Sequence, residues 1–522
     1  MPKSYIKRIL DARIYDVATE TPLEPMRQLS HRCGNRILLK REDLQPVFSF
    51  KVRGAYNKLL QLPADQRARG VIAASAGNHA QGLAMAAAQL GVRATIVMPT
   101  TTPQIKVNAV RMRGAEAILH GDTFDEAAAR ARELVEERGL TFVHPYDDPD
   151  VIAGQGTVAM ELLRQHPGHL DAVFIPVGGG GLAAGMAAYI KYVRPEIAVY
   201  AVEPEDAACL KAAMDAGERV RLPQVGLFAD GVAVAQIGEE TFRVLRQTID
   251  GVITVSSDEI CAAIKDIFED TRSIAEPAGA VGLAGMKKYI EQSGSRNAAL
   301  ATVCSGANTN FDRLRYISER TEIGEKREAV LAVTIPERPG SYLQFCRDLG
   351  DRAITEFNYR FAGAAGHRAH GGEAHIFVGL QVATDVDRQQ LVERLDNGGY
   401  RVTDLTDNEM AKLHIRHLVG GRAEGLTDEV VYRFEFPERP GALRKFLEQL
   451  AGRWNITLFH YRNHGAAYGR VLVGMQVAPA ERQALHDLLE QLHYPFWDES
   501  SNPAYQFFLA GNGKSVETAV AG

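Results

Sequence analysis

The chain lacks the features that mark secreted, zinc-stabilised or membrane proteins. Its 522 residues include only five cysteines, an odd number, and none form a Cys-x-x-Cys pair. Scattered thiols of this kind indicate reduced cysteines rather than a disulfide framework or a zinc site. The N-terminal residues lack the apolar stretch of a signal peptide, and no apolar run approaches the roughly 18 residues that a membrane span needs. These absences predict a soluble, cytoplasmic protein with no membrane partner.

A basic excess is also missing. The chain has 59 Lys+Arg against 65 Asp+Glu, for a net charge of -6. Proteins that bind nucleic acid usually carry a strongly basic surface, so we expect no nucleic-acid partner. The hydrophobic share of 46% and the charged share of 24% are ordinary for globular proteins, and at about 150 residues per domain the length predicts three or four domains.

Short apolar runs alternate with longer helical stretches from about residue 35 to residue 310. We expect strands at 71–74, 94–98, 117–119, 141–143, 172–176, 198–202 and 299–303, and helices at 80–90, 103–113, 124–137 and 183–193. Short, wholly apolar strands between helices indicate parallel strands that are covered on both faces. The predicted fold class of this part is α/β, doubly wound.

An internal repeat follows a charge-rich segment at residues 318–328, which we interpret as a linker. Pro-Glu-Arg-Pro-Gly at 336–340 recurs at 437–441, and Val-Gly-Leu-Gln-Val at 378–382 recurs as Val-Gly-Met-Gln-Val at 473–477. Each copy has the pattern strand, Pro-Gly turn, helix, strand, strand, helix, with the last helices expected at 388–395 and 480–492. This repeat predicts two small α+β modules, at 329–415 and 422–500, followed by a C-terminal tail at 501–522.

Lys51 lies in an aromatic setting, because Phe48 and Phe50 precede it closely. Burial between apolar neighbours disfavours an ammonium and lowers its pKa, and a neutral amine can form a Schiff base with an aldehyde. For a lone lysine, an exposed position at a helix start is the commoner situation. Three other segments favour the chemical interpretation.

One of them is the glycine run at residues 178–181, which follows an expected strand and opens an expected helix. Glycines let backbone N–H groups approach an anion, and a helix N-terminus favours a phosphate. The alternative is a flexible turn. No lysine follows the run, so it is not the P-loop of nucleotide-binding proteins, and it lacks the G-x-G-x-x-G pattern of dinucleotide sites.

The other two segments are polar loops that follow expected strands. In Ser-Ala-Gly-Asn-His at 75–79, Ser75 can cap the next helix, whose free N–H groups can hold a carboxylate, and Asn78 can meet a phenolic oxygen. His79 alone is more often structural than catalytic. Ser305 follows the last strand and can hydrogen-bond a ring nitrogen without a negative charge. For both loops, the alternative is a plain turn.

Together these four segments resemble the fold-type II pyridoxal-phosphate enzymes, the tryptophan synthase β-like group. Residues 49–55 and 75–82 are similar to those of threonine/serine dehydratases, and the resemblance covers about residues 5 to 317. It implies a catalytic domain of two α/β lobes at 1–317, with Lys51 as the lysine that carries the cofactor and acts as base. The implied cofactor-binding residues are Lys51, Phe50, Asn78, Gly178, Gly179, Gly180, Gly181, Leu182 and Ser305. The implied substrate-binding residues are Ser75, Ala76, Gly77, Asn78 and His79.

Some relatives in this group carry a metal at a Glu-x3-Ala-x-Asp motif. Here Glu203 and Ala207 match, but Cys209 stands where the aspartate belongs, so we predict no metal site. Residues 230–231 and 276–280 are also similar to the family, and we interpret them as wall and turn elements without a catalytic role.

The repeated modules resemble the ACT-like modules of biosynthetic threonine deaminases. This resemblance implies β-elimination and deamination of L-threonine to 2-oxobutanoate and ammonia, with L-serine as a secondary substrate, at the first step of isoleucine synthesis. It further implies that the protein is a homotetramer, that isoleucine inhibits it, and that valine opposes this inhibition. The open alternatives are another pyridoxal-phosphate elimination or replacement enzyme, a serine racemase, a non-catalytic amino-acid sensor, or modules that serve only oligomerisation.

Overall fold

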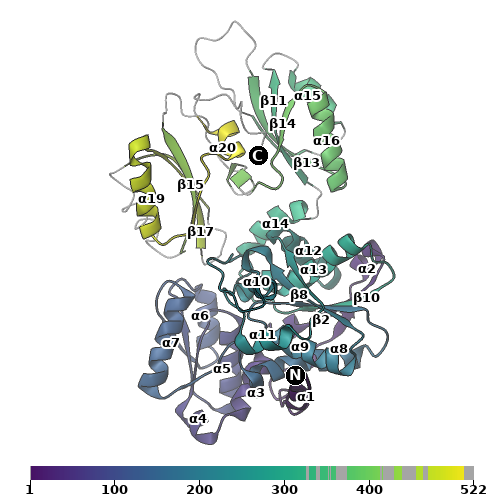
Figure 1. The fold of residues 1–522 in the computed structure, drawn as a ribbon, viewed down its shortest axis with the longest axis vertical. Helices are drawn as coiled ribbons and strands as arrows, with labels where there is room; N and C mark the ends of the chain where they lie inside the picture. Colours follow the sequence, from purple (N-terminus) through teal and green to yellow (C-terminus); the bar gives the residue numbers. More distant parts are fainter. Residues whose placement is uncertain are drawn as a thin grey trace. The chain divides into compact units, whose positions relative to one another are not determined.

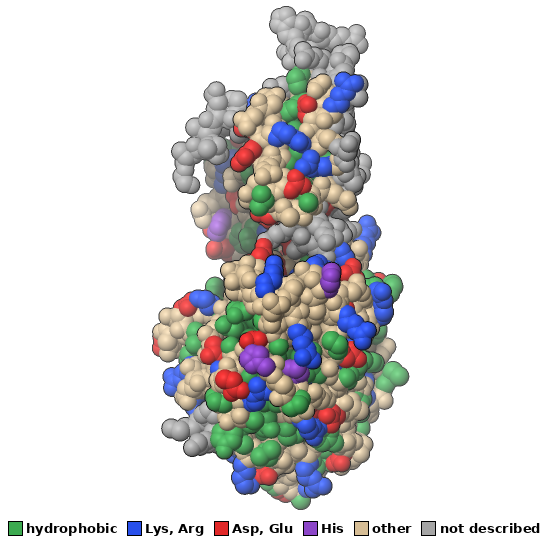
Figure 2. All heavy atoms as spheres, turned by 90° about the vertical axis from the view of Figure 1, so that its right-hand side faces the viewer, with side chains coloured by type: hydrophobic (Ala, Val, Ile, Leu, Met, Phe, Trp, Pro, Cys, Tyr) green, Lys and Arg blue, Asp and Glu red, His purple; other side chains and the backbone are tan. Residues whose placement is uncertain are grey.

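Two units make up the chain, Met1–Thr321 and Glu322–Gly522 (Figure 1). The computed structural model describes residues 2–324, 328–336, 341–350, 352, 354–359, 373–408, 410–411, 414–415, 428–437, 454–462 and 468–510. No helix among these residues has the length and apolar character to cross a bilayer. On the face in Figure 2, the coloured side chains of Lys and Arg are interspersed with those of Asp and Glu.

The first unit contains two sheets. The larger has the order β1-β2-β10-β7-β8-β9, and only β1 is antiparallel. The smaller has the order β5-β4-β3-β6 and is parallel throughout. The strands are β1 (Leu23–Pro25), β2 (Arg36–Arg41), β3 (Val71–Ala74), β4 (Ala94–Met98), β5 (Glu116–Leu119), β6 (Thr141–Phe142), β7 (Ala172–Pro176), β8 (Ala198–Pro204), β9 (Gly251–Val255) and β10 (Ala299–Cys304). The predicted α/β class with two parallel-sheet lobes is confirmed.

Helices cover these sheets, which explains why the central strands are mostly apolar (Figure 1). Every residue of β3, β4, β7 and β10 is buried. The helices are α1 (Pro2–Leu10), α2 (Arg27–Cys33), α3 (Lys51–Gln61), α4 (Ala64–Arg69), α5 (Asn78–Leu90), α6 (Gln104–Arg111), α7 (Phe124–Arg138), α8 (Pro149–Gln165), α9 (Gly181–Val193), α10 (Cys209–Ala216), α11 (Glu239–Leu245), α12 (Ser257–Thr271), α13 (Pro277–Ser293) and α14 (Arg313–Gly324).

Helices α3 and α8 touch backbone to backbone. A Cβ on Gly154 of α8 would lie 2.6 Å from the Arg53 carbonyl oxygen and 2.7 Å from the Gly54 Cα. A Cβ on Gly54 would lie 2.7 Å from the Val151 carbonyl oxygen. Because Lys51 is the first residue of α3, this close packing fixes the helix that presents the lysine.

The charged segment that we expected to be a linker is largely helical. Helix α14 extends to Gly324, and its Arg320 is only 6% exposed. Arg320 pairs with Asp258 of α12 and hydrogen-bonds Tyr316 on its own helix. The charge that suggested a break is therefore partly neutralised inside the first unit.

The described residues of the second unit form two four-stranded antiparallel sheets, ordered β12-β13-β11-β14 and β16-β17-β15-β18. The first belongs to β11 (Glu328–Pro336), α15 (Ser341–Leu349), β12 (Ile354–Tyr359), β13 (Glu373–Gln381), α16 (Asp385–Asn397) and β14 (Arg401–Asp404). The second belongs to β15 (Glu429–Pro437), β16 (Asn455–Arg462), β17 (Tyr468–Gln476), α19 (Arg482–Gln491) and β18 (Phe496–Asp498). Each copy thus has a fourth strand that the repeat did not predict. The Pro-Gly turns, at 337–340 and 438–441, lie outside the described residues.

The tail predicted from residue 501 contributes a helix, α20 (Pro503–Phe508), to this unit. Its Tyr505 is 4% exposed and donates a 2.6 Å hydrogen bond to Glu429 of β15. One hydrophobic cluster joins Tyr505 to Phe377 of the first module and Leu472 of the second. The two modules therefore share a core that includes the tail helix.

Candidate active site

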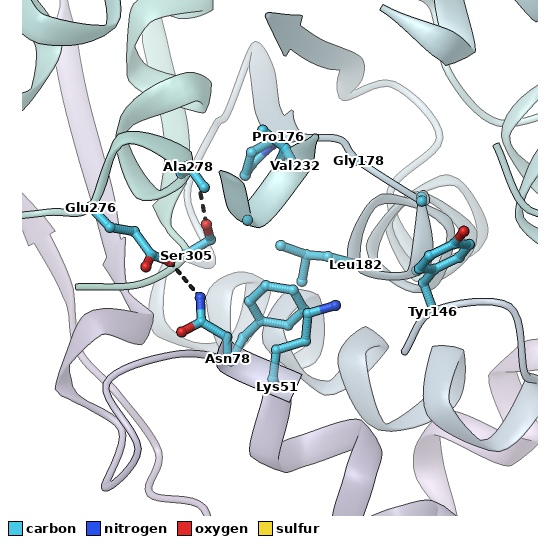
Figure 3. Close-up of a pocket in the computed structure, with 15 residues that line it drawn as sticks. Lys51, Asn78, Tyr146, Pro176, Gly178, Leu182, Val232, Glu276, Ala278 and Ser305 are labelled. Atoms are coloured by element: carbon cyan, nitrogen blue, oxygen red, sulfur yellow. Dashed lines mark hydrogen bonds between the residues drawn. The ribbon is translucent and has the colours of Figure 1, made fainter. Parts of the chain in front are cut away.

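One pocket of the first unit collects all the residues that the sequence assigned to a cofactor (Figure 3). They come from both lobes, because α3 and α5 flank the small sheet while the glycine run and Ser305 follow strands of the large one. The carboxyl ends of parallel strands meet there, as is usual for binding sites of α/β folds. The pocket is lined by Phe50, Lys51, Asn78, Tyr146, Pro176, Gly178, Gly179, Gly180, Gly181, Leu182, Gly231, Val232, Glu276, Ala278 and Ser305.

Lys51 begins helix α3, and its side chain lies in the pocket instead of solvent. Its Nζ donates a 2.9 Å hydrogen bond to the Pro145 carbonyl oxygen. Burial lowers the pKa of the Lys51 amine to about 8, although the charge of Glu276 opposes this shift. Lys51 does lie at a helix start, as the alternative interpretation expected, but its side chain is not exposed to solvent. Near neutral pH, part of this amine is in the nucleophilic, basic form.

The loop before Lys51 is tied to the loop that carries Ser305. Ser49 and Gly306 form a β-bridge, and the Phe50 N–H donates to the Ser305 carbonyl oxygen at 3.3 Å. The Ala307 N–H donates to the carbonyl oxygen of Phe48, which has a φ of 56° in the left-handed region. These bonds hold an unfavourable backbone conformation and fix Lys51 relative to Ser305.

The glycine run forms a cradle that side chains would fill. A Cβ on Gly179 would lie 2.2 Å from the Tyr146 ring, and one on Gly178 would lie 2.8 Å from the Val232 Cα. Gly180 has a φ of 90° and is the N-cap of α9, which begins at Gly181. The first N–H groups of a helix have no partner within it, so this end of α9 can accept a phosphate.

Asn78 has its amide orientation fixed by two neighbours. Its Oδ1 accepts a 2.6 Å hydrogen bond from Asn308, and its Nδ2 donates to Glu276 (Figure 3). An amide nitrogen carries two hydrogens, so one remains for a group in the pocket. Ser305, 4% exposed, donates a long 3.3 Å hydrogen bond to the Ala278 carbonyl oxygen.

The loop assigned to the substrate carboxylate lies beside the pocket, and only its Asn78 is a lining residue. Ser75 does not cap α5: its Oγ accepts a 3.3 Å hydrogen bond from the Gly77 N–H, and Gly77 is the N-cap residue. The loop of Ser75, Ala76 and Gly77 can still bind an anion through its backbone. With no side-chain cap, the N–H groups of the first turn of α5 stay available to an anion.

His79 is a structural histidine in this arrangement. It is 3% exposed, and its Nε2–H donates to the Val143 carbonyl oxygen at 3.0 Å. Burial, together with the nearby charge of Lys51, lowers the pKa of His79 to about 3. The ring is therefore neutral and its Nε2 proton is engaged, so it does not act as a base through that nitrogen.

Six residues that line the pocket are not among those that the sequence assigned to it: Tyr146, Pro176, Gly231, Val232, Glu276 and Ala278. Glu276 was interpreted as a wall element, yet its carboxyl contacts Asn78 inside the pocket. Tyr146, between β6 and α8, packs its ring on the glycine run. The sequence signal for Glu276 is an acid directly before Pro277, a helix-start pattern that is otherwise read as a cap.

Glu203, the remnant of the metal motif, has a helix-capping contact. Its two carboxylate oxygens accept hydrogen bonds of 2.8 Å from the N–H groups of Leu210 and Lys211 in α10. Burial raises its pKa to about 7. Within the described ranges, no group of three or more His, Cys, Asp or Glu residues could hold a metal ion.

A buried ion cluster lies under the start of α3. Arg53 donates to Glu42 at 2.8 Å and to Glu161 at 2.9 Å, and Lys40 pairs with Glu161 at 2.7 Å. All four side chains are fully buried. The cluster joins α3 to α8 and to the end of β2, two residues from Lys51.

Comparison with known proteins agrees with this geometry. Residues 14–306 match the family described as pyridoxal-phosphate dependent enzyme, and residues 319–415 and 420–509 match the C-terminal regulatory domain of threonine dehydratase. L-threonine dehydratase biosynthetic IlvA of Burkholderia multivorans is 57% identical over 97% of this chain and 99% of its own. The Escherichia coli protein of the same name is also 57% identical, over 97% of both chains. A solved structure, the processed form of threonine deaminase isoform 2 from Solanum lycopersicum, is 48% identical with a TM-score of 0.60, and the match covers 61% of this chain and 93% of that one.

A pocket lysine facing a glycine cradle, on a fold of this kind, defines a pyridoxal-phosphate dependent enzyme of fold-type II. Within that class, the chain belongs to the family of the biosynthetic threonine dehydratases, with a C-terminal regulatory domain.

Proposed function

We propose that the chain converts L-threonine to 2-oxobutanoate and ammonia, with L-serine as a secondary substrate. The observation that carries the proposal is the convergence of Lys51, the glycine cradle, Asn78 and Ser305 in one pocket. Relatives at 57% identity that are named threonine dehydratases support the choice of substrate.

The residues of the pocket fit pyridoxal phosphate. The cradle at the N-terminus of α9 suits its phosphate, Lys51 suits its aldehyde, and Phe50 lies beside Lys51 to pack on a ring. The remaining amide hydrogen of Asn78 suits a phenolic oxygen. When bound, this cofactor supplies an electron sink next to the α-carbon of an amino acid.

The chain's own groups then divide the work. The N–H groups at the start of α5, between Ser75 and His79, hold the carboxylate of threonine and orient its α-carbon. Lys51, once free, accepts the α-proton at Nζ, because burial has made its amine easy to keep neutral. Ser305 would offer the ring nitrogen a neutral hydroxyl instead of a carboxylate, once its proton turns from the Ala278 carbonyl oxygen. Without a carboxylate at that position, prompt loss of the β-hydroxyl would be favoured.

Incubation with threonine alone tests the reaction. We expect 2-oxobutanoate from the full-length enzyme and a loss of at least about 1,000-fold in Lys51→Ala, because Lys51 is both the attachment point and the base. Lys58→Ala is the matched control, since Lys58 is on the same helix but pairs with Asp148 and Asp150 away from the pocket. No 2-oxobutanoate from a cofactor-loaded enzyme would exclude the proposed reaction and favour a racemase or a replacement enzyme, and no cofactor absorbance at all would favour a sensor.

We further propose that isoleucine inhibits the enzyme, that valine opposes this inhibition, and that the protein acts as a homotetramer in the cytoplasm at the first step of isoleucine synthesis. The match of the second unit to a regulatory domain supports small-molecule control. Control of this kind needs each ligand to bind two states of the enzyme with different affinity. Turnover of threonine with and without isoleucine tests it, and unchanged turnover at millimolar isoleucine would contradict it.

A further inference from the structure

Glu276 does not use its side chain to cap the helix that it precedes. It is the N-cap of α13, where the shorter Ser, Thr, Asp and Asn are the preferred capping residues, and it makes no side-chain cap. Its carboxyl lies in the pocket instead, and the residue is 4% exposed (Figure 3). The backbone fixes this placement, because the Glu276 N–H donates to the Gly306 carbonyl oxygen at 3.1 Å.

The carboxyl fits tightly against the loop of Ser305. A Cβ on Gly306 would lie 2.3 Å from Glu276 Oε1, so only glycine leaves room for it. The same Oε1 accepts the hydrogen bond from Asn78 Nδ2. With Asn308 donating to Asn78 Oδ1, the relay Asn308–Asn78–Glu276 has one polarity, which turns Asn78 into a donor toward the pocket.

Charged groups surround Glu276 on several elements. Among these charges, Asp230 has the largest effect on the pKa of Glu276. Asp230 is itself paired with Lys106 at 2.9 Å and with Arg313 at 3.4 Å. Lys51 and the buried thiol of Cys304 also feel the charge of Glu276. Burial raises the pKa of Glu276 to about 7, and Asp230 adds to the shift, so this carboxyl changes charge near neutral pH. Its negative charge favours a positive charge on the nitrogen of Lys51.

We propose that Glu276 is a positioning residue of the active site: it fixes Asn78 as a donor to the cofactor's phenolic oxygen, and its charge stabilises the protonated nitrogen of Lys51 in the resting enzyme. This role rests on the proposed function for the identity of the cofactor, but not for the identity of the substrate. The role has two parts that can be tested separately. One is the length of the side chain, which brings the carboxyl to Asn78, and the other is the negative charge near Lys51.

The test follows the visible absorbance of the bound cofactor in the full-length holoenzyme from pH 5.5 to pH 10, without threonine. The long-wavelength visible band of the lysine-bound cofactor depends on a protonated Lys51 nitrogen, and it disappears when that nitrogen loses its proton. Removing a nearby negative charge makes a cation easier to deprotonate. The band of Glu276→Gln should therefore disappear at a pH lower by at least about half a unit than that of the wild type. Glu203→Gln is the matched control, because Glu203 is equally buried and its pKa is also raised to about 7, but it lies outside the pocket lining. Its band should disappear at the wild-type pH.

The reach of the carboxyl is tested with Glu276→Asp, which keeps the charge but is too short to hold Asn78. We expect the band to titrate as in the wild type while the cofactor dissociation constant rises at least about fivefold, as for the loss of one hydrogen bond to a pocket group. Circular dichroism checks that the variants are folded. If Glu276→Gln is not, Glu276→Ala takes its place as the variant that removes the charge, and Glu276→Asp still decides the positioning role.

The charge role would be overturned if the band of Glu276→Gln disappeared at the wild-type pH or above. It would also be overturned if the bands of both proteins persisted to pH 10. Wild-type cofactor affinity in Glu276→Asp would overturn the positioning role. Neither readout uses threonine turnover, so an enzyme that fails to deaminate threonine but shows both effects would disprove only the proposed substrate.

Discussion

At the scale of single residues, the chemistry depends on the protonation of Lys51. Burial lowers the pKa of its amine to about 8, and only the neutral form can take the α-proton. We therefore expect kcat at saturating threonine to rise up to about tenfold per pH unit below pH 8 and to level off above it. A kcat series from pH 6 to pH 10 measures this, and a flat profile would show that Lys51 deprotonation does not limit the reaction.

Arg53 shows how much the setting of Lys51 depends on buried charge. Its guanidinium is fully buried between Glu42 and Glu161. Arg53→Met would leave two carboxylates competing for Lys40 alone, and breaking a buried pair in this way costs about 3–5 kcal/mol. We expect a lower thermal midpoint and weaker cofactor binding, measured by circular dichroism and by the visible band. The exposed pair of Lys7 and Asp11 offers a control, since Lys7→Met should change neither.

At the scale of elements, the close contact of α3 and α8 positions the lysine. Gly154→Ala would push its new Cβ into the Arg53 carbonyl oxygen, 2.6 Å away, so the two helices must separate. Overpacking of this kind typically costs about 1–3 kcal/mol. We expect the melting temperature and the cofactor affinity to fall together, because the displaced helix begins at Lys51. A destabilised variant with unchanged cofactor affinity would show that the loop contacts of Ser49 and Phe50 position the lysine by themselves.

In the first unit, the sequence predicts seven strands and misses β1, β2 and β9. The strands at 71–74, 94–98 and 172–176 match β3, β4 and β7, because buried parallel strands are apolar on both faces. Strands β14 and β18 escaped notice because they are short and no residue in them is buried. Helix α14 overlaps the linker expected at 318–328, because its charged residues, such as Arg320, find partners only in the folded unit.

At the scale of the whole molecule, the chain divides into a unit that holds the pocket and a unit that matches a regulatory domain. We expect a chain that ends after Gly324, which keeps all of α14, to retain threonine turnover and to lose isoleucine inhibition. Turnover of both forms with and without isoleucine measures this. Inhibition that persists in the folded, shortened enzyme would place the effector site in the first unit.

Local sequence patterns were enough to predict the α/β class and the repeat, and the family resemblance that they carry implied nine of the residues that line the pocket. Strand periodicity, glycine runs and a lysine among aromatics are local patterns, and local patterns are legible without a structure. The hydrogen-bond partners of Ser75, His79 and Glu276 could be identified only from the folded chain. The neutral state of His79 and the direction of the Glu276 carboxyl depend on partners more than 60 residues away in the chain, Val143 and Asn78. Ser75 differs, because its hydroxyl accepts a hydrogen bond from the Gly77 N–H only two residues away and does not cap α5. Burial and hydrogen bonding set those properties of His79 and Glu276, and both arise when distant segments pack together.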